Sequence, residues 1–104
     1  MAPIIRLTLF KLPDQSILDQ AIEKYSTLTK DALKQNTPYI QSSSAHRLHD
    51  DARSQGYTLL ARTVFASRED MDYFDKEDGA HGGLQAVIRP GLGEMPLVVY
   101  SDGV

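Results

Sequence analysis

His81 is the residue whose type and surroundings best suit catalysis. An imidazole with an ordinary pKa of about 6.5 takes up and releases protons near neutral pH. Small neighbours leave room for a ligand and expose backbone N–H groups that can hold a developing oxyanion; they are Gly79, Gly82 and Gly83. Acidic neighbours can orient or bias the imidazole; they are Asp75, Glu77 and Asp78. The pattern predicts general acid/base chemistry at His81, with a helix-capping or packing role as the alternative.

Other side chains can place a substrate beside this histidine. The Tyr73 hydroxyl can polarise a carbonyl while His81 moves a proton, or its ring can simply fill the seam between helix and sheet. Tyr25 can direct its hydroxyl into a pocket between helix and sheet, or it can belong to the core. Arg6 needs a partner or a ligand anion if it faces inward, and has no special role if it faces solvent. Tyr57 completes the substrate-binding candidates.

Metal and cofactor sites are not expected. His46, His49, Asp50 and Asp51 contain metal-ligating types, but no further ligand with defined geometry accompanies them, and a solvated polar loop is the favoured interpretation. The chain has no cysteine, which excludes disulfides and thiolate chemistry. The glycines of 91–93 do not form a phosphate loop, because no strand precedes them and no helix follows.

The elements that must position His81 surround it in the sequence. Residues 57–65 are rich in β-branched and aromatic types and predict a strand. Ser67 has the position of a helix N-cap, with Asp70 three residues later as a weaker capping box. The helix that follows is expected to end at Gly79, so that His81 lies in a turn.

The remaining segments complete an α+β pattern. We expect strands at 4–11, 39–47 and 97–101, helices at 16–35 and 83–89, and a polar loop at 46–55. This order predicts a ferredoxin-like sandwich with an antiparallel sheet and helices on one face. The open face, to which we assign Leu59, Ala61, Thr63 and Phe65, predicts a homodimer that pairs two sheets.

Several short motifs, in order, resemble the stress-responsive dimeric α/β-barrel (Dabb) family. They are the strand from Arg6 to Lys11, Gly56-Tyr57-Thr58, Phe65-x-Ser67, Asp72-Tyr73 and Ala80-His81. The resemblance covers most of the chain and implies an eight-stranded barrel shared by two chains. It includes the olivetolic acid cyclase-like members, which carry a catalytic histidine at the position of His81, an Asp-Tyr pair before it and an aromatic residue at the position of Tyr25.

The sequence departs from those members in two places. The segment between Tyr73 and His81 is about two residues longer, which on a helix rotates one residue relative to the other by about half a turn. Arg6 stands where many family members have a histidine. Both differences concern the arrangement of site residues that the resemblance implies.

The bulk properties limit the classes of function. A length of 104 residues fits a single domain over 1–104. A formal charge of −3 without a basic cluster argues against nucleic acid and membrane partners. No signal peptide is expected, so a cytoplasmic location is the default.

The sequence thus predicts a cofactor-independent cyclase or lyase acting on a small carbonyl compound. A non-catalytic stress-responsive barrel and, third, a haem- or quinone-directed oxygenase are the alternatives.

Overall fold

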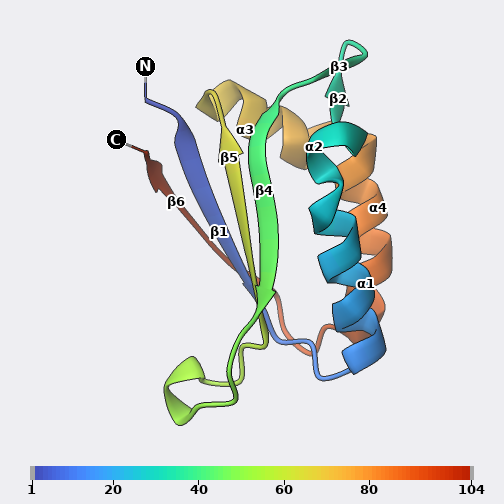
Figure 1. Cartoon of the computed structure of the whole chain (residues 1–104), viewed down its shortest axis with the longest axis vertical. Helices are drawn as coiled ribbons and strands as arrows, with labels where there is room; N and C mark the ends of the chain where they lie inside the picture. The colour runs from blue at the N-terminus through green and yellow to red at the C-terminus, as the bar shows by residue number, and fades with distance from the viewer. Residues whose placement is uncertain (1, 104) are drawn as a thin grey trace.

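The computed structural model describes residues 2–103 as an antiparallel sheet with helices packed on one face (Figure 1). Along the chain the elements are β1 (Ile4–Phe10), α1 (Gln15–Ser26), α2 (Leu28–Asp31), β2 (Leu33–Lys34), β3 (Thr37–Pro38), β4 (Ile40–Arg47), the 3-10 turn η1 (Ala52–Ser54), β5 (Leu59–Phe65), α3 (Arg68–Lys76), α4 (Gly79–Ile88), the 3-10 turn η2 (Arg89–Gly91) and β6 (Leu97–Asp102). The sheet order is β4-β5-β1-β6, and all neighbouring strands are antiparallel. This arrangement is the ferredoxin-like α+β fold, as the order of elements predicted.

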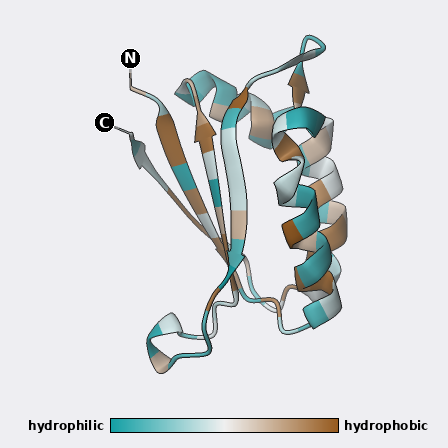
Figure 2. Cartoon of the chain, in the orientation of Figure 1, coloured by the Kyte–Doolittle hydropathy of each residue, from teal (hydrophilic) through white to brown (hydrophobic). Residues whose placement is uncertain are grey.

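The two central strands, β1 and β5, carry most of the apolar side chains of the sheet. Figure 2 shows brown segments along both strands, whereas the serine run of β4 is pale. On β1, every second residue is buried beneath the helices, beginning with Ile4 and ending with Phe10. Arg6 and Thr8 therefore lie on the helix-covered side of the sheet.

The assignment of residues to the open face was wrong for β5. The four residues assigned to it are all buried and belong to the helix-covered side: Leu59, Ala61, Thr63 and Phe65. The register instead places on the opposite side a set that we call the open face: Ile5, Leu7, Leu9, Leu60, Arg62, Val64, Leu97 and Val99. The alternation of side chains along a strand separates the two faces of the sheet. When both faces are apolar, it does not show which of them the helices cover.

The long helix expected at 16–35 is divided. Helix α1 starts where predicted, because the Asp14 carboxylate accepts hydrogen bonds from the first-turn amides of Ser16 and Ile17. It ends at Ser26, whose hydroxyl donates to the Glu23 carbonyl. A single turn, α2, follows, and then the hairpin β2–β3. The hairpin turns through two residues in the left-handed region, Gln35 (φ 53°) and Asn36 (φ 62°).

Helix α4 begins four residues earlier than expected. Ser67 does cap α3, since its hydroxyl accepts the Asp70 amide, but Gly79 opens a helix rather than only ending one. The cause is Asp78, a buried N-cap whose carboxylate accepts the Ala80 amide at 2.8 Å and the Tyr39 hydroxyl at 2.5 Å. His81 consequently lies in the first turn of α4, and not in a loop. No helix within residues 2–103 is long and apolar enough to cross a bilayer.

Candidate functional site

A cavity of about 540 Å³ lies between α4 and the half of the sheet formed by β1 and β6. Its volume is in the range of pockets that bind small organic molecules, roughly 300–1,000 Å³. The polar side chains that line it are Arg6, Thr8, Tyr25, Thr63, Asp75, His81, Gln85 and Arg89. Most of the remaining wall is apolar, contributed by residues such as Phe10, Phe74, Leu84, Ile88 and Val98. The cavity thus brings three of the predicted site residues together: His81, Tyr25 and Arg6.

His81 is held at the wall of this cavity by α3 and by the cap of its own helix. Its ring lies 4.5 Å from the Phe74 ring between centroids, and its side chain is only 17% exposed. Burial lowers the pKa of His81 below 6.5, although the nearby Asp75 carboxylate opposes this shift. The imidazole is therefore neutral at pH 7 and can accept a proton.

The neighbouring glycines leave space beside His81, and two amides of this segment are already bonded. A Cβ atom added at Gly79, Gly82 or Gly83 would meet no atom within 4 Å. The amides of Ala80 and Gly82 both bond Asp78 at the start of the helix, so neither is free to hold an oxyanion.

Arg6 faces inward and has a partner. Its Nη1 donates to Asp75 Oδ1 at 2.5 Å, and the same carboxylate oxygen lies 3.9 Å from His81 Nε2. A distance of 3.9 Å is too long for a hydrogen bond but short enough for an electrostatic effect. Asp75 thus stands between a permanent cation and an imidazole, and it can stabilise the protonated form of His81.

Tyr25 reaches the cavity from α1. Its ring is buried and packs against Phe10, with 6.4 Å between centroids. Burial raises the pKa of Tyr25 to about 12, so its hydroxyl stays protonated at neutral pH. Within residues 2–103, no protein group hydrogen-bonds this hydroxyl, and no fully buried side-chain oxygen or nitrogen lacks a partner. The hydroxyl is therefore accessible from the cavity and can donate to a ligand.

Tyr73 is not brought together with His81. Its hydroxyl donates to the Leu33 carbonyl at 3.1 Å, and its ring meets Tyr39 edge-on, at 5.4 Å between centroids. Tyr73 does not line the cavity that contains His81. The rotation implied by the longer segment between the two residues agrees with this separation.

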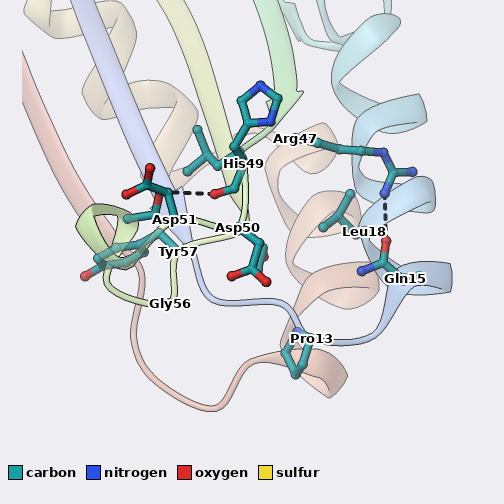
Figure 3. Close-up of a pocket in the computed structure, with 12 residues that line it drawn as sticks. Pro13, Gln15, Leu18, Arg47, His49, Asp50, Asp51, Gly56 and Tyr57 are labelled. Carbon is teal, nitrogen blue, oxygen red and sulfur yellow. Dashed lines mark hydrogen bonds between the residues drawn. The ribbon is translucent and has the colours of Figure 1, made fainter.

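Tyr57 lines a second, smaller hollow of about 350 Å³ (Figure 3). This hollow lies at the end of α1 that is opposite the β2–β3 hairpin (Figure 1). Figure 3 shows Tyr57 beside the η1 turn and Arg47 directed toward Gln15, with which it forms a 2.8 Å hydrogen bond. His49 and Asp50 also line this hollow. Among residues 2–103, no group of three or more His, Cys, Asp or Glu side chains could hold a metal ion.

Sequence reasoning missed four polar residues of the cavity: Thr8, Thr63, Gln85 and Arg89. A signal was present for two of them. Thr8 shares a strand face with Arg6 through the two-residue period. Gln85 follows His81 by four residues and so shares a helix face with it. Thr63 pairs with Arg6 across the sheet, a register that only the fold reveals.

The sheet order and the cavity beneath α4 define a ferredoxin-like chain with a ligand-sized cavity between helices and sheet. The stress responsive A/B barrel domain matches residues 4–100. The chain therefore belongs to the stress-responsive A/B barrel family, as its motifs indicated.

Known proteins resemble the chain in sequence and in structure. A fusaristatin A biosynthesis cluster protein of Gibberella zeae is 36% identical over 83 residues, which cover 80% of this chain. The match spans only 60% of that curated relative. A dimeric Bacteroides fragilis protein of unknown function, with a ferredoxin-like fold, has a TM-score of 0.81 at 12% identity over 99% of this chain and 98% of its own. The hydroxynitrile lyase of Passiflora edulis has a TM-score of 0.77 at 16% identity over 99% of this chain and 94% of its own. At such identities the structural likeness concerns the fold alone.

Proposed function

We propose that this chain is a cofactor-independent enzyme of the cyclase or lyase type. Its substrate is a small organic molecule with a carbonyl group, and His81 is the general acid/base. The observation that carries the proposal is the half-buried imidazole on the wall of a largely apolar cavity, with the Asp75 carboxylate 3.9 Å away. Such a site combines a proton carrier, a group that stabilises its charged form and room for the substrate.

The reaction that this geometry favours starts with proton abstraction next to the carbonyl. Neutral His81 takes a proton from the substrate, and Asp75 stabilises the imidazolium that forms. The Tyr25 hydroxyl donates a hydrogen bond to the carbonyl oxygen, on which negative charge develops. In a ring closure, the enolate carbon attacks a second carbonyl carbon of the same molecule, and the alkoxide that forms takes the proton back from His81. In an elimination, the leaving group on the β carbon departs with that proton. Tyr25 thus takes the role that sequence reasoning gave to Tyr73.

The comparisons support this proposal at the level of the family. The Gibberella zeae relative is named for a biosynthesis cluster, which agrees with chemistry on small organic molecules. The Passiflora edulis neighbour is a lyase on the same fold. The motifs shared with the olivetolic acid cyclase-like members are the reason that a cyclisation is included in the proposal.

The pH dependence of activity gives a first prediction. Because the pKa of His81 lies below 6.5 and the imidazole must be neutral to act as a base, kcat/KM should be constant near pH 7 and should fall with one proton as the pH drops through that pKa. Tyr25, with its pKa raised to about 12, should cause no loss up to about pH 10. The measurement is kcat/KM on a panel of β-keto and cyanohydrin-type substrates between about pH 5 and pH 10. Activity that increases with acidification would contradict the role of His81 as a base.

A non-catalytic assembly protein is the second candidate function, and the open face favours it. Leu97 and Val99 are exposed there beside the apolar side chains of β1. An assembly role requires this face but not the cavity. Absence of turnover on the whole panel, together with a stable oligomer, would favour this candidate.

Both candidates predict a homodimer at micromolar concentration, formed through the open face. Pairing two such faces across a two-fold axis removes their apolar side chains from water. Leu7 lies on the central strand β1 with Arg62 and Val99 on either side, so Leu7→Arg should give a monomer. Light scattering of the wild type and of Leu7→Arg measures this difference. A wild-type protein that is monomeric at every concentration would refute the shared barrel.

A further inference from the structure

The Arg6 guanidinium has N–H donors that remain available to a ligand inside the cavity. Its side chain is only 10% exposed, and Nη1 bonds Asp75 Oδ1 at 2.5 Å. A guanidinium has five N–H donors, and within residues 2–103 the one acceptor that bonds the Arg6 side chain is Asp75. No buried side-chain nitrogen in residues 2–103 lacks a partner, so the remaining nitrogens of Arg6 contact accessible space. Since Arg6 lines the cavity, that space is where a substrate would bind.

The charges around the cavity favour an anion. Two arginines, Arg6 and Arg89, are among the residues that line it, but only one acidic residue, Asp75. With His81 neutral, one positive charge is in excess, although the whole chain has a formal charge of −3. A cleft with apolar walls focuses such a local field and attracts ligands of opposite charge. An excess of one charge matches a monoanion better than a phosphate.

Arg6 and His81 both lie near the same carboxylate oxygen, which limits the distance between the two groups. Asp75 Oδ1 is 2.5 Å from Arg6 Nη1 and 3.9 Å from His81 Nε2. The Phe74 ring lies against both of them, 5.8 Å from the Arg6 guanidinium carbon and 4.5 Å from the centre of the His81 ring. A molecule of a few carbon atoms can therefore contact the guanidinium at one end and the imidazole at the other.

We propose that the substrate is a keto acid, whose carboxylate binds the free donors of Arg6 while its carbonyl end lies at His81 and Tyr25. This inference rests on the proposed function and specifies its substrate class. Planar carboxylates suit the guanidinium fork because two parallel N–H···O bonds can form. Asp75 competes for the same guanidinium, so it weakens binding of the acid.

The test is the affinity for matched acid and ester ligands that are not turned over. Levulinate and 4-oxodecanoate are compared by titration calorimetry with their methyl esters, which keep the carbonyl and lose the charge. The wild type should bind each acid about 10- to 100-fold more tightly than its ester, as expected for hydrogen bonds between charged groups. Equal affinities, or no binding of either acid, would overturn the proposal.

Three variants test whether the preference for the acid over the ester arises at Arg6. Arg6→Gln should reduce the preference for the acid to less than about threefold, and a thermal melt checks that it folds. Asp75→Asn removes the competing carboxylate and should bind the acids several-fold more tightly than the wild type, an increase that a destabilised protein would not give. Arg53→Gln, at an exposed arginine on η1 that does not line the cavity, removes the same charge and should leave the preference unchanged. An equal loss in Arg53→Gln, or weaker acid binding in Asp75→Asn, would contradict a site at Arg6.

A second readout reports on His81 directly. The charged groups that shift the pKa of its imidazole are Arg6 from β1, Asp75 from α3 and Asp78 at the start of α4. An anion bound to Arg6 offsets the positive charge of the guanidinium, which disfavours protonation of His81. The NMR titration midpoint of His81 should therefore rise with the acid and not with the ester.

Inorganic phosphate that binds in an Arg6-dependent way, when the keto acids do not, would refute the proposal that Arg6 binds a carboxylate. Turnover of neutral substrates without any preference for acids would overturn this inference alone. A preference for acids without turnover of any substrate would instead count against the proposed enzyme.

Discussion

His81→Ala should keep the fold and lose about 10²- to 10⁴-fold in turnover, the usual contribution of a positioned general acid/base. The substitution removes the group that carries the proton, while the cavity, Arg6 and Tyr25 remain. The helix that holds residue 81 does not depend on the ring, because the Asp78 carboxylate caps it through the Ala80 amide. The measurement is kcat on the best substrate of the panel, together with a thermal melt and the oligomeric state.

His49→Ala is the matched control for this variant. His49 lines the smaller hollow near η1, so its loss removes an imidazole without touching the His81 cavity. Its turnover should equal that of the wild type. A fully active His81→Ala variant would refute the catalytic role of His81. A variant that unfolds would show that the packing of the ring against Phe74 is structural, as the alternative role of His81 requires.

The helices and strands near His81 could be predicted from the sequence where neighbouring residues alone determine where an element begins or ends. Ser67 was identified as a cap from its type and position, and its hydroxyl does accept the Asp70 amide. The start of α4 was missed because Gly79 was taken only as the end of the preceding helix, and the next helix was placed at 83–89. The capping signal of Asp78, an acidic residue directly before the helix, was present in the sequence. Its stabilisation by Tyr39, through a hydrogen bond between residues 39 positions apart, was not.

Some residues of the candidate site could be predicted from the sequence, but their arrangement could not. The sequence singled out His81, Tyr25 and Arg6, and all three line one cavity. The pairing of Arg6 with Asp75 joins residues separated by 69 positions, and no local pattern encodes such a contact. Tyr73 shows the reverse case: it is close to His81 in sequence, yet its hydroxyl bonds Leu33 instead. Whether Arg6 faced inward also depended on which side of β1 the helices cover.

Leu28→Ala should lower the free energy of unfolding by roughly 2–5 kcal/mol, the range for removing a buried leucine side chain. Leu28 is 1% exposed and belongs to the core, although it lies in the short turn α2 and not in the middle of a long helix. Truncation removes its methyl groups from contact with the core and leaves a cavity that the short α2 turn can only partly close. Chemical denaturation of both proteins, at one fixed protein concentration because an oligomer gains stability with concentration, measures the difference.

Leu33→Ala is the control, since it removes the same atoms five residues later from a side chain that is 40% exposed. It should cost less than about 1 kcal/mol, because little burial is lost and the surroundings leave no void. The comparison therefore separates the effect of burial from that of residue type. If Leu28→Ala costs no more than Leu33→Ala, α2 does not pack on the core as described, and the segment that connects α1 to β4 is anchored elsewhere.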